Sequence, residues 1–334
     1  MGVCMNGRRP ASALVLVLLA IASMAQAGVR RSVRSAHLRP EEPLVSVRVR
    51  PKRGLRDQLA RGTLIGEIVN DEAVAMKATN ASSIVTLHLP RGMLRKVIFK
   101  PKSGEKDAGH GIAVGTFYRR EIAVSQLDEA LSLNLVPTTV ELTGKQGIGS
   151  AQLFSDRSTL ATRVDPKKIS LDRVSAEKLR AFDYLIGNSD RSWRNLMVKK
   201  SRGVYLPVAI DNGYTLPTAV PARFLWPHSL LRGQVGPLTS EAKQFIAAID
   251  PQRVARVLIE AGIERKAVVQ VLRRLAHLQT DPSFLEIRRP GWGPYQMTLA
   301  VEKQIKNRTQ GLSAEQLKEI ERIVRTAAAE AVVD

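Results

Sequence analysis

The chain has 334 residues, a hydrophobic fraction of 44% and a formal net charge of +20 at neutral pH. A chain of this length and composition is expected to fold into one or two domains without long disordered tracts. Its positive charge favours anionic partners: nucleotide phosphates, acidic lipid headgroups, acidic proteins or nucleic acid. The only cysteine is Cys4 and the five histidines are scattered, which excludes a disulfide framework and argues against a zinc or haem site.

Residues 1–27 have the pattern of a secretory signal peptide. The pair Arg8-Arg9 precedes an apolar stretch over 11–22, and residues 25–27 form a cleavage site of the A-x-A type. We therefore expect a secreted or periplasmic protein that lacks these residues in its mature form. An uncleaved N-terminal membrane anchor is one alternative. Translation from a later methionine, which would keep the protein in the cytoplasm, is another.

Residues 28–61 are expected to form a basic extended arm or linker. The segment is rich in arginine, contains three prolines and has valines alternating with polar residues over 45–49. That alternation is what one edge strand would show. Such an arm is either solvated or bound to an anionic surface.

Residues 62–156 have a β-rich pattern. Apolar runs bounded by turn residues predict strands at 63–69, 73–76, 83–89, 95–100, 136–142 and 148–154. The glycines around the last turn fit no nucleotide-binding motif. Gly144-Lys145 lacks the earlier glycine of a P-loop, and Gln152 stands where a dinucleotide fingerprint needs its third glycine.

Lys100 ends the strand over 95–100 and is followed by Pro101, which cannot continue the hydrogen-bonded ladder. A lysine at the end of an apolar strand can project into a cleft and meet the α- and β-phosphates of a nucleotide. Lys102 is a competing candidate for this contact, and the alternative is an ordinary surface lysine.

A helix is predicted over 117–131, with one apolar stripe made of Phe117, Val124, Leu127 and Leu131. Glu121 falls on this stripe. A carboxylate on the buried side of a helix needs a partner, and Lys100 is the candidate for an ion pair. Asp128 and Glu129 are expected to be solvated or to cap backbone groups.

Residues 182–217 place three oxygen-bearing side chains, Asp190, Asn195 and Asp211, around two apolar strands separated by a basic turn. Mg²⁺ prefers hard oxygen ligands and is usually held by one or two carboxylates plus substrate phosphates. The spacing from Asp190 to Asn195 is that of a kinase catalytic loop, with a metal-binding aspartate downstream. For Asp211, which precedes Asn-Gly, an ordinary turn is the alternative.

Helices are further predicted over 176–186, 240–249, 251–261, 264–278 and 314–333. Asp250 and Pro251 fit a helix start, and Gly262 fits a helix stop. The basic residues of the fourth helix are expected to form a solvated face; they are Arg265, Lys266, Arg273 and Arg274.

With these residues in place, the chain resembles the phosphatidylinositol 3-/4-kinase-like branch of the kinase superfamily. That branch includes type II phosphatidylinositol 4-kinases, actin-fragmin kinase and secreted Golgi casein kinases. Residues 97–105, VIFKPKSGE, are similar to the strand that carries the ATP-binding lysine, and 119–142 to the helix and strand that follow. Residues 183–198 and 209–217 are similar to the catalytic and metal-binding loops. Many members have a histidine two residues after the catalytic aspartate, where this chain has Ser192.

The resemblance implies an α+β fold, the bilobal fold of protein kinases. The N-lobe, an antiparallel sheet plus one helix, would span 62–156, and a mostly helical C-lobe would span 157–334. Glu121 would pair with Lys100, which contacts the phosphates, and Asp190 would be the catalytic aspartate.

The resemblance also implies ATP and Mg²⁺, or Mn²⁺, as cofactors, with Asn195 and Asp211 on the metal. Two further groups of residues are expected beside the nucleotide. Ser82 and Ser83 would belong to a glycine-poor loop that covers the phosphates, and Gln152, Leu153 and Phe154 would lie near the adenine.

The expected function is a kinase that moves the γ-phosphate of ATP to a hydroxyl acceptor, a protein serine or threonine more than a phosphoinositide. The alternative from another class is a secreted pseudokinase that binds a nucleotide or an anionic partner. The sequence opposes this alternative because it contains all five residues assigned to catalysis and metal binding: Lys100, Glu121, Asp190, Asn195 and Asp211. Nucleic-acid binding is not expected, since no recognised binding motif occurs and aromatic residues make up only 4% of the chain.

Overall fold

A computed structural model of the chain describes residues 52–61, 63–69, 80–106, 112–165, 168–188, 190–218, 237–286 and 312–331. These residues all belong to one compact unit, 49–334. The predicted signal peptide, the arm over 28–51 and the strand over 73–76 lie outside the described residues.

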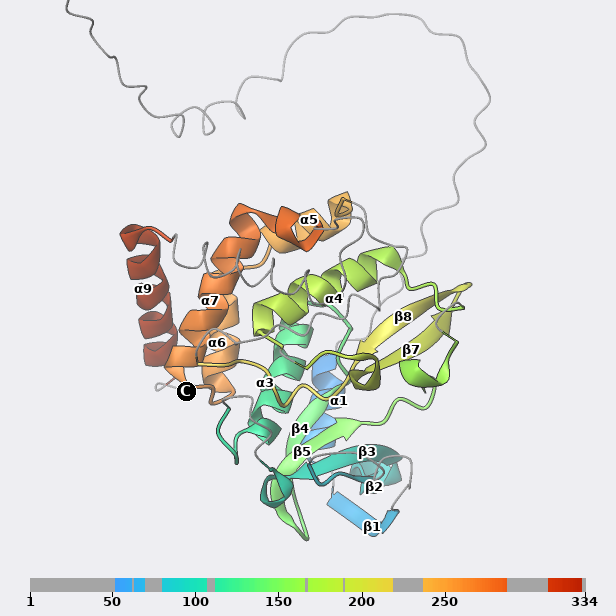
Figure 1. The fold of residues 1–334 in the computed structure, drawn as a ribbon. Coiled ribbons are helices and arrows are strands. Elements are labelled where there is room, and N and C mark those ends of the chain that lie inside the picture. Colours follow the sequence, from blue (N-terminus) through green and yellow to red (C-terminus); the bar gives the residue numbers. More distant parts are fainter. Residues whose placement is uncertain are drawn as a thin grey trace, which may run out of the picture. The chain divides into compact units, whose positions relative to one another are not determined.

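The N-lobe is built on a five-stranded antiparallel sheet in the order β1-β2-β3-β5-β4 (Figure 1). Its strands are β1 (Thr63–Val69), β2 (Ser83–His88), β3 (Leu94–Pro101), β4 (Thr139–Gly144) and β5 (Gly147–Leu153). Side chains alternate across a strand, so Val97 and Phe99 of β3 are buried in the core while Lys96 is exposed. These strands confirm the β-rich pattern.

Helix α3 (Phe117–Ala130) packs against β4 and β5. It buries Phe117, Val124 and Leu127 of the predicted stripe together with Glu121, which is 2% exposed, whereas Leu131 follows the helix and is half-buried. A remote carboxylate holds the start of this helix: Glu105 accepts the backbone N–H groups of Gly115, Phe117 and Tyr118 at 2.5, 3.1 and 2.8 Å. A negative charge at a helix N-terminus satisfies donors that the helix cannot pair itself.

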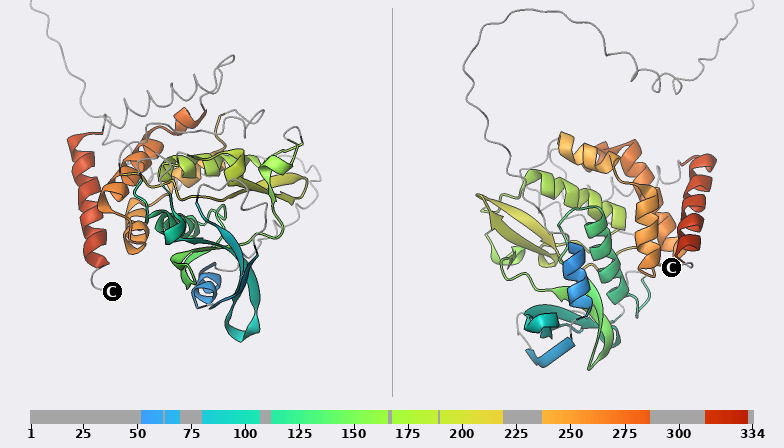
Figure 2. Two further views of the ribbon diagram at one scale, coloured as in Figure 1. Left: turned by 60° about the horizontal axis from the view of Figure 1, so that its bottom comes forward. Right: turned by 180° about the vertical axis from the view of Figure 1, so that it is seen from behind.

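The end of the predicted arm is a helix and not an extended segment. Helix α1 (Lys52–Ala60) lies beside α3, as the right view of Figure 2 shows. Leu55 and Leu59 are spaced for one helical face, and Leu59 is fully buried in the N-lobe core. Arg56 donates to Glu129 Oε2 at 2.8 Å, so α1 is bound to α3 by an ion pair.

The C-lobe combines a small antiparallel sheet, in the order β6-β7-β8, with five helices among the described residues. The strands are β6 (Thr159–Leu160), β7 (Leu196–Ser201) and β8 (Val204–Ala209). The helices are α4 (Arg173–Ile186), α5 (Ser240–Ala247), α6 (Pro251–Glu260), α7 (Arg265–Thr280) and α9 (Ala314–Glu330). Asp250 caps α6 as predicted, accepting from the N–H of Gln252 at 2.9 Å. Together the two lobes confirm the α+β, bilobal fold.

Two charged side chains are buried, and for Arg274 this makes the expectation of a solvated face wrong. Asp128 was expected to be solvated or to cap backbone groups; it is fully buried and caps backbone groups. It accepts the backbone N–H groups of Leu135 and Val136 at 2.8 and 3.1 Å, which offsets the cost of burying its charge. Arg274 is also buried and donates to the carbonyl of Leu185 at 2.9 Å. Burial lowers the pKa of its guanidinium to about 10.

Candidate active site

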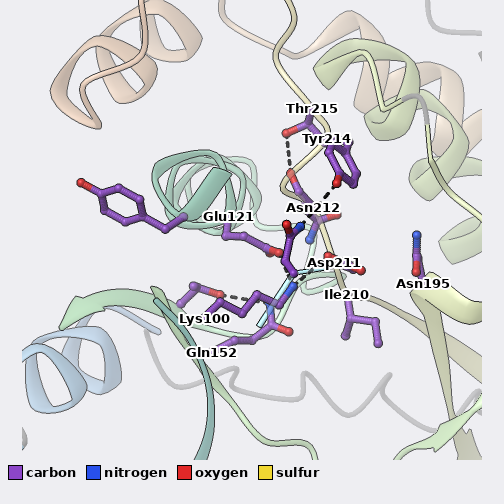
Figure 3. Close-up of polar contacts among 12 residues, drawn as sticks. Lys100, Glu121, Gln152, Asn195, Ile210, Asp211, Asn212, Tyr214 and Thr215 are labelled. Carbon is purple, nitrogen blue, oxygen red and sulfur yellow. Dashed lines mark hydrogen bonds and ion pairs between the residues drawn. The ribbon is translucent and has the colours of Figure 1, made fainter. Parts of the chain in front are cut away.

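The predicted pair of Lys100 and Glu121 is in contact, and Asp211 joins it. The ammonium Nζ of Lys100 donates to Glu121 Oε1 at 2.5 Å and to Asp211 Oδ1 at 2.8 Å. Figure 3 shows the lysine reaching between the helix and the loop that carry these carboxylates. Three elements far apart in the sequence, β3, α3 and the segment after β8, thus meet at one cation.

The opposite charges of Lys100 and its carboxylate partners shift the pKa values of Lys100 and Asp211. Burial alone would lower the pKa of Lys100, but the carboxylates of Asp211 and Glu121 outweigh it and raise that pKa above its usual value. Lys100 in turn lowers the pKa of Asp211. Lys100 and Asp211 are therefore expected to be charged at neutral pH. Among the described residues, the second oxygen of Glu121, Oε2, is buried and accepts no hydrogen bond.

Asp190 and Asn195 form the second half of the site. The side-chain nitrogen of Asn195 donates to Asp190 Oδ2 at 2.8 Å and to the Asp190 carbonyl at 2.7 Å. Both bonds involve Nδ2, so the amide oxygen of Asn195 faces away from these acceptors. Figure 3 draws Asn195 apart from the lysine cluster.

The strand register brings the two loops together. Leu196 pairs with Ala209, and the Ile210 N–H donates to the Asn195 carbonyl at 3.2 Å. Asn195, at the end of a 3-10 turn before β7, is therefore adjacent to the segment that carries Asp211. Sequence spacing alone does not show this pairing, since it depends on the register of the β7–β8 hairpin.

Arg191 is a buried residue of the site that the sequence analysis missed. Its guanidinium donates to both oxygens of Asp183 at 3.1 Å, to the carbonyls of Asn195 and Ile210 at 2.6 and 2.7 Å, and to Asn212 Oδ1 at 2.5 Å. It thereby links α4 to both candidate loops. No helical or strand periodicity marks an irregular loop, so its only sequence signal is its position next to Asp190.

Arg120 is a second residue that the sequence analysis missed, although a signal for it exists. It lies three residues after Phe117 and four before Val124, on the same stripe that located Glu121. The structure buries it to 2% exposure. Its Nη1 donates to the carbonyls of Thr215 and Leu216.

The backbone around Asp211 takes an unusual course. Asp211 has φ of 56°, a left-handed conformation that non-glycine residues adopt rarely. Two positions later, a Cβ on Gly213 would lie 3.2 Å from Cβ of Phe117 on α3. A glycine at 213 therefore lets the loop pass close to the helix that carries Glu121.

The residues expected near ATP lie at the start of β2 and at the end of β5, with Ser82 just before β2 and Phe154 just after β5. Ser83 is the first residue of β2 and is buried, and Ser82 precedes it. Gln152 is buried on β5, where its Nε2 donates to Thr139 Oγ1 at 3.2 Å. Figure 3 shows Gln152 beside Lys100.

The backbone N–H groups of Leu153 and Phe154 already donate within the N-lobe. Their acceptors are the carbonyls of Thr138, at 2.8 Å, and Lys96, at 2.9 Å. At these two residues the backbone carbonyls are therefore the groups to consider for a contact with adenine.

The oxygen donors fit a magnesium or manganese ion. The Asp211 side chain is 44% exposed, and Asn195 turns its amide oxygen away from Asp190. Hard oxygens of this kind are what Mg²⁺ takes when phosphates supply further ligands. No group of three or more His, Cys, Asp or Glu side chains placed to hold a metal occurs among the described residues.

Comparison with known proteins identifies the family. The family model "Phosphatidylinositol 3- and 4-kinase" matches residues 94–278, more than half of the chain. The chain belongs to this family. The kinase so identified is a phosphotransferase with a hydroxyl group as acceptor, and the matched region contains all five residues assigned to catalysis and metal binding.

Solved structures and curated proteins give a further comparison. The kinase is similar to a Golgi casein kinase with Mn/ADP bound, at 16% identity over 68% of this chain and 74% of that chain, with a TM-score of 0.44. It is similar to hydra Fam20 with sugar, at 16% identity, 80% and 92% coverage and a TM-score of 0.45. It is also similar to the Helicobacter pylori proinflammatory kinase CtkA, at 14% identity over 77% of this chain and 93% of that chain, with a TM-score of 0.32. A search of curated proteins found no match.

Within the part of the kinase that the structure describes, none of the helices has the length and apolar character needed to span a membrane.

Proposed function

We propose that this kinase transfers the γ-phosphate of ATP, with Mg²⁺ or Mn²⁺, to a serine or threonine hydroxyl of an acidic protein. The observation that carries the proposal is the Lys100 ammonium held between Glu121 and Asp211 at 2.5 and 2.8 Å. Phosphoryl transfer needs few covalent steps from the protein and depends on positioned charges. A bound metal–nucleotide complex would supply the phosphoryl group and a divalent cation that offsets the negative charge of the phosphates.

Each side chain has a distinct part in this proposal. Lys100 contacts the α- and β-phosphates, and Glu121 keeps the ammonium in place. Asp211 and the amide oxygen of Asn195 would hold the metal. Asp190 orients the acceptor hydroxyl or takes its proton, since the amide of Asn195 fixes its carboxylate.

Charge favours an anionic acceptor, and the preference for a protein acceptor rests on the predicted export. Arg194, on the loop between Asp190 and Asn195, is exposed. A basic residue there favours an anionic acceptor, which an acidic protein and a phosphoinositide both provide. The signal peptide predicted over 1–27 favours the protein, because an exported kinase meets secreted proteins before the lipids of the cytoplasmic face.

The test is transfer of labelled γ-phosphate to casein, to phosphatidylinositol vesicles and to the kinase itself, with and without Mg²⁺. The Asp190→Asn variant sets the background. We expect casein to be labelled well above that background and the vesicles less. Labelled vesicles with unlabelled casein would contradict the protein acceptor. A wild type that binds ATP but labels nothing above background would instead be a pseudokinase.

A further inference from the structure

Arg120 joins three parts of the molecule at one buried guanidinium. Its Nη1 donates to the carbonyl of Thr215 at 3.0 Å and to that of Leu216. Its Nη2 donates to both carboxylate oxygens of Glu264 at 3.2 Å. It lies on α3, whereas its acceptors lie on the segment after Asp211 and at the residue before α7.

The 210–216 segment, which carries Asp211, is held by arginine at both ends. Arg191 contacts the Ile210 carbonyl and the Asn212 side chain at its start. Arg120 contacts the carbonyls of Thr215 and Leu216 at its end. Figure 3 shows the residues from Ile210 to Thr215 passing the helix that carries Glu121.

The same segment contains two unfavourable backbone conformations. Asp211 and Leu216 have φ of 56° and 54°, in the left-handed region. Non-glycine residues persist there when surrounding contacts fix them. At Leu216 the described contacts include the Arg120 bond to its carbonyl and its own N–H bond to the Ile186 carbonyl at 2.7 Å.

We infer that Arg120 is a positioning residue, which holds the 210–216 segment against α3 and so keeps the Asp211 carboxylate placed to bind the metal. Arg120 and Glu121 are neighbours on α3, so one helix holds both carboxylate partners of Lys100: one directly and one through the segment. The inference rests on the proposed function for the metal-binding role of Asp211.

The test compares Arg120→Lys with Arg119→Lys on the same helix. Lysine keeps the charge but cannot reach two carbonyls and a carboxylate at once, because it lacks the planar fork of arginine. Arg119 is exposed and is a matched control. We expect hydrogen exchange across residues 210–216 to be faster in Arg120→Lys, by roughly tenfold or more, as for one lost hydrogen bond to a charged group. Unchanged exchange would overturn the inference.

A second measurement asks whether Arg120 acts through Asp211. In Arg120→Lys, the Mg²⁺ concentration for half-maximal ATP binding should rise by roughly tenfold, for the same lost bond. In the Asp211→Asn background, the same change should add little, because effects that share one group are not additive. Full additivity would show a merely structural role and overturn the inference.

Glu264→Gln keeps the inference testable if Arg120→Lys does not fold. Glu264 is 46% exposed, and its loss leaves the carbonyl contacts of Arg120 in place. Smaller shifts in the same directions are expected, and their absence overturns the inference. A wild type without Mg²⁺-dependent ATP binding would overturn the proposed function, whereas a wild type that binds, with variants that match it, would overturn only the role of Arg120.

Discussion

Lys100 and Asp190 occupy the two halves of the candidate active site, and their surroundings differ in kind. The Lys100 ammonium contacts two carboxylates, and their charges raise its pKa. The Asp190 carboxylate accepts from the amide of Asn195, a neutral partner. The first half therefore holds a cation fixed by two carboxylates, while the second holds a carboxylate oriented by an amide. Nucleotide binding and turnover should accordingly respond to different substitutions.

The largest expected effect is on turnover, which a substitution at Asp190 should lower without removing nucleotide binding. Asp190→Asn keeps the size of the side chain and removes the carboxylate that is proposed to orient the acceptor hydroxyl or take its proton. Turnover should fall by roughly 10²–10⁴-fold, the range for a lost acid–base group, while ATP still raises the melting temperature. Initial rates of γ-phosphate transfer and a thermal shift with ATP and Mg²⁺ measure the two quantities. Loss of both would show that Asp190 also serves nucleotide binding.

The next effect concerns Arg191, on which both halves depend. Arg191→Met leaves the buried Asp183 without its cation and the carbonyls of Asn195 and Ile210 without donors. The free energy of unfolding should fall by about 3–5 kcal/mol, as for a broken buried ion pair. Arg194→Met, on the exposed face of the same loop, should change it by no more than about 0.5 kcal/mol. Urea denaturation that gives equal losses would contradict the assigned role of Arg191.

A smaller effect tests the lysine half alone. With ATP at about 100 times its dissociation constant, binding should stabilise the wild type by about 2.7 kcal/mol. Lys100→Met should lose most of this gain, because the proposed function places the ammonium on the phosphates. Lys102→Met should keep it, since Lys102 is exposed. Thermal shifts with Mg²⁺ measure the difference, and an equal loss in both variants would remove Lys100 from the nucleotide site.

The smallest effect is a pH dependence. Lys100 lowers the pKa of Asp211 in the folded protein. The ionised carboxylate therefore stabilises the fold at pH values above its pKa in the unfolded chain, about 3.9, and this stabilisation is lost as the pH falls through the folded pKa. The destabilisation caused by Asp211→Asn should thus be present at pH 7 and shrink towards pH 2. It should stay below about 1 kcal/mol, because solvent screens a partly exposed pair. Denaturation curves at both pH values measure it, with the exposed Glu141→Gln as control.

Periodicity made part of the site predictable from the sequence. The helical stripe located Glu121, and the strand predicted to end before Pro101 located Lys100. The same period places Asp128 seven residues after Glu121, which indicates a buried face, yet the sequence analysis left open whether Asp128 is solvated or caps backbone groups.

Contacts between distant loops were not predictable in this way. Arg191 lies in an irregular loop, and Glu105 caps a helix that begins at Phe117, so neither follows a local pattern. Helix α1 was missed because its arginines and lysine suggested a solvated arm, although Leu55 and Leu59 share one face.

Helix α1 also bears on where the cooperative folding unit starts. The family match begins at residue 94, but Leu59 is fully buried among core residues of β2, β3 and β4, and Arg56 binds α3. A fragment cut at the family boundary would lack α1, β1 and β2. It would leave β3 as an open sheet edge, with unpaired N–H and C=O groups next to Lys100. Open edges of this kind template aggregation, so soluble expression of the catalytic region requires the residues upstream of the family match.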